Sequence, residues 1–324
     1  MTAAPSVAAA PLGLSRRDVA VPWIADLHDA ATALFTALDR GGEFREDRWI
    51  RPGGGGGVTR VLAEGETFEK VGVNRSAVEG ELPAATAQRF GARVGHEASV
   101  KFFATGLSIV AHPRNPHVPT VHLNVRYFEL VNDDSEICDT WFGGGTDLTP
   151  TYPTHEDARS FHRALKSVCD EHHASFYPRF KPECDVYFRN THRANEARGV
   201  GGVFFDHLRS GEDGSGLEEA RMQQFVGAVG RSLEQTYAPI VERARSTPHG
   251  ESERALQLAR RARYAEFNLL HDKGTLFGLQ TSARIESVLM SLPPLAAWDY
   301  MPDGPPDALG QAMAAMLIPR DWAE

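Results

Sequence analysis

The segment from Thr120 to Leu130 constrains the fold of this chain more than any other. In an extended strand, alternate residues share a face, so His122, Asn124 and Arg126 fall on one side. The residues between them are apolar: Val121, Leu123, Val125 and Tyr127. This alternation predicts a β-strand with one face in a core and one polar face. Solvent exposure would explain the polar face, but an imidazole, a carboxamide and a guanidinium together also suit a large ligand with several carboxylates.

A second strand is expected from Phe102 to Ala111. Three prolines at positions 113, 116 and 119 separate it from the first, and proline cannot donate to a β-ladder. If the two strands pair as a hairpin, His112 approaches His122. Ser108 lies on the same side of its strand as His112.

The remaining elements favour an α+β fold in one domain. Apolar spacing predicts helices from Pro22 to the glycines at 41–42 and over 156–177, 217–237, 251–263 and 305–317. Strands are expected at 200–205, 264–270, 276–279 and 285–292, a glycine turn between strands at 53–57, and a strand end with a glycine turn at 141–153. Strands joined by short turns, with helices in separate blocks, indicate an antiparallel sheet. We therefore expect a flexible N-terminal tail of residues 1–21 and a single domain of residues 22–324.

Composition excludes several classes of protein. The formal charge is −9, with 43 acidic and 34 basic residues and no basic block, which argues against nucleic-acid binding. No apolar run is long enough for a transmembrane helix. The three cysteines lack a CxxC pattern and no signal peptide precedes them, so a reducing cytoplasm is expected. Neither GxGxxG nor a P-loop motif occurs, so no nucleotide site is predicted.

Other polar residues have both a structural and a functional interpretation. Neutral imidazoles bind divalent metals, but His112, His122, His162 and His192 follow no local ligand motif such as HExxH. Each of them could equally be a structural histidine. Asp147, in GGGTDLTP, could present a carboxylate in a cleft or stabilise a turn.

Four long segments carry a resemblance to a known family. They are FFATGLSIVAHPRNPHVPTVHLNVRYFE (102–129), WFGGGTDLTPTYP (141–153), YFRNTHRANEARGVGGVFFD (187–206) and RYAEFNLLHDKGTLFGLQTSARIESVLMSLPPLAAWDY (263–300). The chain closely resembles oxygen-dependent coproporphyrinogen III oxidases from about residue 22 to its C-terminus. The resemblance implies a large flat antiparallel sheet of about seven strands with helices on both faces, and a homodimer formed through residues 264–299.

The resemblance also implies a reaction of haem biosynthesis. Two propionate groups of coproporphyrinogen III become vinyl groups, giving protoporphyrinogen IX, with dioxygen as co-substrate. No organic cofactor is implied, while a divalent metal is, with manganese favoured.

Residue roles follow from the matched positions. Ser108, Asn124, Val125 and Arg126 correspond to substrate-binding residues, and His122 corresponds to a proton donor. Asp147 corresponds to an aspartate that holds the pyrrole N–H groups. The four metal ligands implied are His112, His122, His162 and His192.

One departure from the family pattern concerns the wall of the cleft. Ser282-Ala283-Arg284 stands where the family has Gly-Gly-Arg, so the arginine is kept but two added side chains narrow the wall. Arg126 and Arg284 are expected to pair with propionates. Two alternatives stay open, a metal-dependent oxygenase with four histidine ligands and a non-catalytic tetrapyrrole-binding protein.

Overall fold

A seven-stranded antiparallel sheet forms the centre of the computed structural model, which describes residues 16–89, 91–94, 99–132, 136–211, 215–280, 283–300 and 308–324. Its strand order is β1-β2-β3-β4-β5-β6-β9. The strands are β1 (Phe44–Ile50), β2 (Gly55–Ala63), β3 (Phe68–Pro83), β4 (Ser99–Pro113), β5 (Thr120–Val131), β6 (Ile137–Thr149) and β9 (Gly201–Leu208). A separate two-stranded sheet contains β7 (Arg189–Asn190) and β8 (Glu196–Ala197). The predicted α+β class and antiparallel sheet are confirmed.

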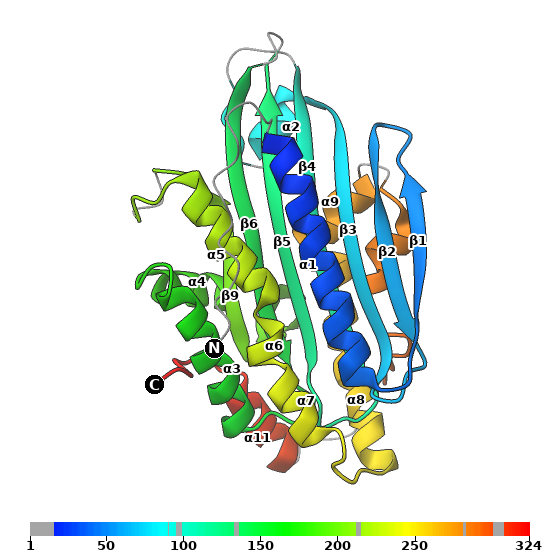
Figure 1. The fold of residues 1–324 in the computed structure, drawn as a ribbon. Coiled ribbons are helices and arrows are strands. Elements are labelled where there is room, and N and C mark those ends of the chain that lie inside the picture. Colours follow the sequence, from blue (N-terminus) through cyan, green and yellow to red (C-terminus); the bar gives the residue numbers. More distant parts are fainter. Residues whose placement is uncertain are drawn as a thin grey trace.

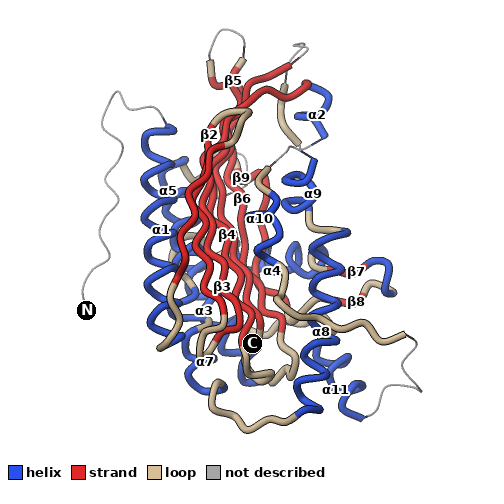
Figure 2. Tube along the Cα trace, turned by 90° about the vertical axis from the view of Figure 1, so that its right-hand side faces the viewer, coloured by secondary structure: helices blue, strands red, loops and turns tan. Residues whose placement is uncertain are grey.

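Helices cover both faces of the sheet (Figures 1 and 2). One face carries α1 (Arg16–Asp39), α3 (His155–Asp170), α5 (Glu219–Arg231), α6 (Leu233–Thr236) and α7 (Ala238–Ala244). The opposite face carries α8 (Glu251–Leu270), α9 (Lys273–Gln280), α10 (Ile285–Val288) and the 3-10 turn η2 (Leu289–Ser291). Among the other helices, α4 (Phe176–Tyr187) packs against β9, and the rest are α2 (Ala84–Arg89), η1 (Thr191–Arg193) and α11 (Ala308–Met316). None of the described helices combines the length and apolar character needed to cross a membrane.

The main core lies between the sheet and α1 with α5. The apolar side of β5 enters it, and Leu123 and Val125 are fully buried there. A methyl group added at Gly230 of α5 would meet Leu27 of α1 at 3.0 Å and Val125 at 3.6 Å, so this glycine lets α5 lie close to its neighbours. Each buried aliphatic side chain stabilises the fold by about 1.5–3 kcal/mol relative to exposure. The apolar side of β5 thereby fixes which way its polar side points.

Three predicted strands near the C-terminus are wrong. Residues 264–270 continue α8, residues 276–279 lie in α9, and residues 285–292 contain α10 and η2. In α8 the buried residues Tyr264, Phe267 and Asn268 stand three and four positions apart, the helical spacing. The high content of aromatic and β-branched residues in these segments favoured strands, but packing against the sheet overrides that propensity.

Other element boundaries also differ from expectation. Helix α1 begins at Arg16 with Pro22 inside it, so part of the predicted tail is helical, while residues 1–15 lie outside the description. The helices predicted at 156–177 and 217–237 are each divided in two, and α8 extends beyond 263. The glycines of WFGGGTD are not a turn, because β6 continues through them to Thr149. The strands predicted at 102–111, 120–130 and 200–205 are confirmed. The glycine turn predicted at 53–57 is confirmed only at Gly53 and Gly54, because Gly55, Gly56 and Gly57 already belong to β2.

Candidate active site

The functional residues of the polar sheet face stand in register across neighbouring strands. One row across β3, β4, β5 and β6 contains Asn74, Ser108, Asn124 and Gly145. A second row contains Ser76, Gly106, Arg126 and Gly143, and a third contains Val110, His122, Asp147 and Gly202 of β9. Directly opposite residues of an antiparallel pair share a face. The predicted hairpin of β4 and β5 therefore places Ser108, Asn124 and Arg126 beside one another.

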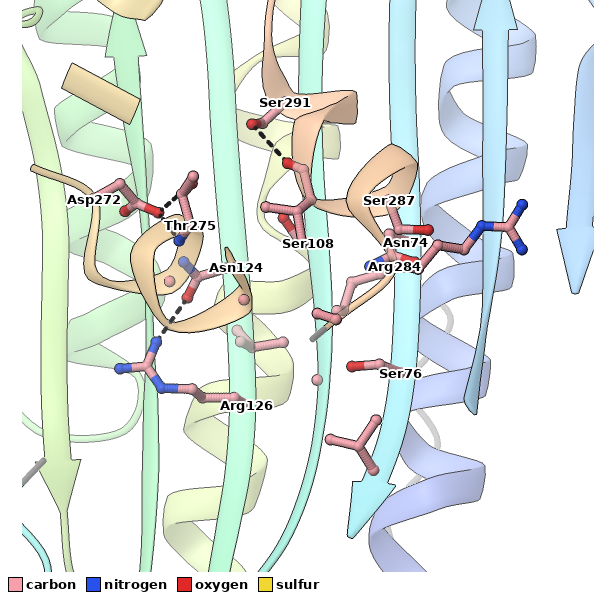
Figure 3. Close-up of a pocket in the computed structure, with 18 of the residues that line it drawn as sticks. Asn74, Ser76, Ser108, Asn124, Arg126, Asp272, Thr275, Arg284, Ser287 and Ser291 are labelled. Atoms are coloured by element: carbon pink, nitrogen blue, oxygen red, sulfur yellow. Dashed lines mark hydrogen bonds between the residues drawn. The ribbon is translucent and has the colours of Figure 1, made fainter. Parts of the chain in front are cut away.

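A cavity of about 290 Å³ lies between this face and the helices α9 and α10. Figure 3 shows labelled side chains of β3, β4 and β5 facing side chains of the covering segment. Of the predicted site residues, those lining the cavity are Ser108, His122, Asn124, Val125, Arg126, Ala283 and Arg284. The covering segment contributes Asp272, which accepts hydrogen bonds from Tyr187 Oη at 3.0 Å and from the Thr275 amide at 2.7 Å.

Two predicted positions need qualification. The Val125 side chain is fully buried in the core on the opposite face, so only its backbone can face the cavity. Ser282 lies outside the described residues. Ala283 does line the cavity.

His122 is anchored by a buried aspartate. Its Nδ1 lies 3.0 Å from Asp147 Oδ1, and because a carboxylate accepts, this nitrogen carries a proton. The other nitrogen, Nε2, lies 3.5 Å from Asn124 Nδ2 on the cavity side. The imidazole thus has one nitrogen tied to the protein interior and one turned toward the cavity.

Asp147 itself does not line the cavity. Arg198 donates from Nη2 to Oδ1 at 2.6 Å and from Nε to Oδ2 at 3.1 Å, a two-pronged contact. Both side chains are only 1% exposed. Both carboxylate oxygens of Asp147 are engaged by Arg198 and His122 in this structure, and the role of Asp147 toward the pyrrole N–H groups stays a prediction.

Aromatic rings enclose the Arg198 guanidinium. Its central carbon lies 4.1 Å from the Phe188 ring centre, 4.6 Å from that of Tyr264 and 4.7 Å from that of Phe267. Such faces attract a cation and exclude water. The guanidinium is held in place from several sides and can fix Asp147 rigidly.

Arg198 and Asp147 each stabilise the charged form of the other. Burial alone would raise the pKa of Asp147, but the Arg198 guanidinium and the His122 imidazole outweigh it and hold that pKa below its usual value. Burial would likewise lower the pKa of Arg198, and Asp147 overcomes it, so the pKa is raised. Asp147 is consequently a permanent anion next to His122 at neutral pH.

Both cavity arginines are already paired with aspartates. Arg126 Nη2 lies 2.7 Å from Asp206 Oδ1, and Arg284 Nη2 lies 2.6 Å from Asp47 Oδ2. The two guanidinium side chains are each about one-third exposed, at 34%. They can therefore reach an anionic ligand that enters the cavity.

Comparisons with known proteins agree with this geometry. A profile of the family described as Coproporphyrinogen III oxidase matches residues 20–322. The chain belongs to this family. It is 50% identical over 295 residues to oxygen-dependent coproporphyrinogen-III oxidase of Drosophila melanogaster, covering 90% of this chain and 74% of that protein. It is 47% identical over 305 residues to the protein of the same name from Synechococcus sp. (strain CC9902), covering 88% of this chain and 81% of that protein.

His112 and His162, two of the four metal ligands that the resemblance implies, lie beside polar groups of the protein interior. His112 Nε2 lies 2.8 Å from the Ser291 carbonyl, and burial holds the pKa of His112 well below its usual value. His162 lies between Tyr177 Oη at 2.9 Å and the Val200 carbonyl at 3.0 Å, and burial lowers its pKa to about 3. Neither residue lines the cavity.

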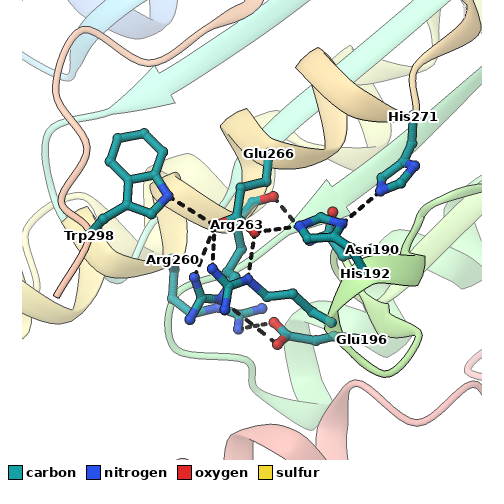
Figure 4. A network of polar contacts seen from close by, with 9 residues as sticks. Asn190, His192, Glu196, Arg260, Arg263, Glu266, His271 and Trp298 are labelled. Atoms are coloured by element: carbon teal, nitrogen blue, oxygen red, sulfur yellow. Dashed lines mark hydrogen bonds and ion pairs between the residues drawn. The ribbon is translucent and has the colours of Figure 1, made fainter. Parts of the chain in front are cut away.

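His192 belongs to a surface network (Figure 4). Its Nε2 lies 2.9 Å from Glu266 Oε2, and its Nδ1 lies 2.8 Å from His271 Nε2. Glu266 also pairs with Arg193, which, with the other hydrogen-bond donors, lowers the Glu266 pKa to about 2. Within the ranges that the structure describes, no three His, Cys, Asp or Glu side chains are grouped to hold a metal. The four imidazoles are not grouped in this structure, and their binding of a shared divalent metal stays a prediction.

Sequence reasoning missed several residues of the site. Asn74 and Asp272 line the cavity, Arg198 fixes Asp147, and Asp206 pairs with Arg126. Asp206 carried a local signal, since it directly follows the apolar run at 200–205. Arg198 carried none, because its partner stands 51 positions away in the sequence.

Proposed function

We infer that this protein catalyses the oxidative decarboxylation of two propionate groups of coproporphyrinogen III to vinyl groups, with dioxygen as oxidant. The observation that carries this inference is the buried Arg198–Asp147–His122 series, which ends at a cavity bordered by Arg126 and Arg284. A protein that only carried a tetrapyrrole would need the cations but not an imidazole with a fixed tautomer. Family membership supports the same reaction.

The stoichiometry shows what the protein must supply. For each propionate, the bond to the carboxylate carbon breaks and carbon dioxide leaves. A hydrogen leaves the β carbon, which is attached to the ring, with its electron pair and reduces dioxygen, which needs one further proton to become hydrogen peroxide; the electrons of the broken carbon–carbon bond form the vinyl double bond. His122 is suited to handle that proton because its Nε2 faces the cavity while Asp147 stabilises the charged imidazolium.

Substrate carboxylates are bound by the cavity arginines. Arg126 holds the reacting propionate, and Arg284 holds another at the opposite side of the cavity (Figure 3). Guanidinium groups pair with carboxylates through two parallel hydrogen bonds, which fixes orientation as well as position. Ser108 and Asn124 add neutral hydrogen-bonding groups between them.

Asp147 acts through His122 rather than on the substrate. It is buried and does not line the cavity, so its part is to fix the ring orientation and the Nδ1–H tautomer of His122. Arg198 in turn keeps Asp147 ionised. Both are positioning residues.

Dioxygen is the proposed co-substrate, and no organic cofactor is proposed. The divalent metal, manganese favoured, stays a prediction. Exhaustive chelation followed by a turnover measurement tests this prediction, and full turnover of the metal-free protein would refute it. Loss of turnover that manganese restores would establish a metal requirement.

The homodimer and the cytoplasmic location are also proposals. Large apolar side chains are exposed within the expected interface at Leu269, Leu270, Leu279, Ile285, Leu295 and Trp298. Exposed large apolar side chains of this kind are typical of a protein interface when they form a contiguous patch. Sedimentation velocity should show a dimer, and Leu295→Glu should weaken it. The three cysteines are free thiols, which suits a reducing compartment.

The experiment that tests the function is aerobic incubation of the protein with coproporphyrinogen III, followed by mass measurement of the tetrapyrrole. We expect loss of two carboxyl groups in air and no change in an anaerobic control. Binding without any loss of carboxyl groups in air would instead identify a non-catalytic carrier.

A further inference from the structure

The Arg126 guanidinium is occupied before any substrate arrives. Its Nη2 donates to Asp206 Oδ1 at 2.7 Å, and its Nη1 lies 3.4 Å from Asn124 Oδ1. Asp206 is 21% exposed and does not line the cavity. Burial would raise the pKa of Asp206, but Arg126 and His207 outweigh it and the pKa is lowered. Asp206 is therefore an anion that holds Arg126 at the cavity edge.

The fold contains a specific path for this contact. Arg126 on β5 faces Gly143 on β6, whereas Asp206 lies one strand farther, on β9. A methyl group at Gly143 would stand only 2.6 Å from the guanidinium carbon of Arg126. The absence of a side chain at Gly143 lets Arg126 cross β6 to reach Asp206.

A bulge places Asp206 at the end of this path. Phe142 pairs with Leu208 and Gly144 pairs with Phe205, so Gly143 faces two residues of β9 instead of one. The second of them, His207, is left-handed with φ of 53°, and its amide donates to Asp206 Oδ1 at 3.0 Å. Bulges of this kind re-aim side chains next to functional sites.

The other cavity arginine has the same arrangement. Arg284 pairs with Asp47 at 2.6 Å, and Asp47 also does not line the cavity. Each cation that would bind a propionate thus has a carboxylate of the protein beside it. The repetition at two separate places argues that the pairing belongs to the function of the cavity.

We infer that Asp206 is a competing counter-ion that a substrate propionate displaces from Arg126, and that Asp206 takes the guanidinium back once that propionate has lost its carboxylate. The inference rests on the proposed function. The vinyl arm that results is uncharged and no longer competes for Arg126. Exchange with Asp206 then weakens the hold on the converted arm and favours its departure, so that the next propionate can enter.

The test measures affinity rather than turnover. Coproporphyrin III, the stable oxidised form of the substrate, carries the same four carboxylates. Its binding is measured by quenching of tryptophan fluorescence, to which Trp49 at the cavity contributes. Asp206→Asn keeps the shape and an acceptor for the His207 amide but removes the charge. Because partly exposed ion pairs contribute modestly, we expect the Kd to fall about two- to fivefold.

Two controls separate this explanation from others. Asp170→Asn removes one negative charge from the surface pair with Lys166 and should leave the Kd unchanged. In an Arg126→Gln background, Asp206→Asn should also have no effect. An equal fall in Kd in the Asp170 variant, or a fall that persists without Arg126, would overturn the inference.

The direction of the change in Kd decides between exchange and a purely structural role of Asp206. If Asp206 served only to hold Arg126 in position, its loss would leave the Kd unchanged or raise it. Should Asp206→Asn fail to fold, Asp206→Ser offers the same test with a smaller side chain. Turnover by the unaltered protein is measured in parallel: its absence refutes the proposed function, while turnover with an unimproved Kd in the Asp206 variant refutes only the exchange.

Discussion

Replacing Arg198 by methionine should destabilise the protein by about 3–5 kcal/mol, because it leaves a buried carboxylate without its cation. Arg198 and Asp147 are each 1% exposed, so water cannot replace the missing partner. The change also removes a cation from contact with three aromatic rings. Asp147→Asn, which leaves the guanidinium unpaired instead, should have a cost of similar size.

The double variant provides the quantitative test. With both charges gone, neither partner is left buried and unpaired, so the free energy of unfolding should recover by about 2 kcal/mol relative to the sum of the single changes. Urea unfolding at pH 7 of the four proteins gives the coupling energy directly. Additive costs, within about 0.5 kcal/mol, would refute the view that Arg198 and Asp147 act as one buried pair.

The same pair predicts a pH dependence. A carboxyl group whose folded-state pKa is depressed contributes its full stabilisation above the ordinary aspartate pKa of about 3.9 and loses it as the pH falls through the lower folded value. The pKa of Asp147 is depressed in this way. The stability difference between the unaltered protein and Asp147→Asn should therefore shrink on acidification below about pH 4.

Three further changes test other parts of the structure. His122→Ala should lower turnover about 10²–10⁴-fold with an unchanged circular dichroism spectrum, and a loss of less than tenfold would remove His122 from proton transfer. His162→Gln should reduce the stability that the protein loses between pH 7 and 5. Burial lowers the pKa of His162 to about 3, so below about pH 6.5 only the unfolded chain takes up this proton, which costs the folded state about 1.4 kcal/mol per pH unit. Urea unfolding at both pH values gives the two free energies, and an equal loss of stability in the variant and the unaltered protein would contradict this. Leu123→Ala should lower the free energy of unfolding by about 2–5 kcal/mol, because Leu123 is fully buried. It should leave kcat unchanged at low temperature, where the variant stays folded, because Leu123 faces away from the cavity. A fall in kcat of the folded variant would contradict this.

The strands were predictable where alternation was strong. The expected strand at 120–130 corresponds to β5 at Thr120–Val131, because one apolar and one polar face leave a single workable orientation. The glycines of β6 were misassigned, since the need for a bare position opposite Arg126 arises only once β5 and β6 pair. Local propensity favours strands from Tyr264 onward because it does not include the sheet on which these segments pack.

The composition of the site was more predictable than the role of each member. The sequence pattern placed His122, Asn124 and Arg126 together, and the structure does the same. It could not show that Asp147 turns inward, because that depends on Arg198 and on the aromatic rings around it. The pairing of Arg126 with Asp206 likewise depends on a β-bulge in β9, which no local sequence pattern predicts.

The strict alternation along β5 has a consequence for errors during folding. If this strand paired one residue out of step, an imidazole and a guanidinium would be driven into hydrocarbon, while valines and a leucine would face water. Charged groups without partners in such surroundings cost several kcal/mol each, so the misaligned form could not accumulate. Chains that complete the sheet therefore carry the reactive groups on the correct side, and loss of activity by strand slippage is suppressed by the same residues that perform the chemistry.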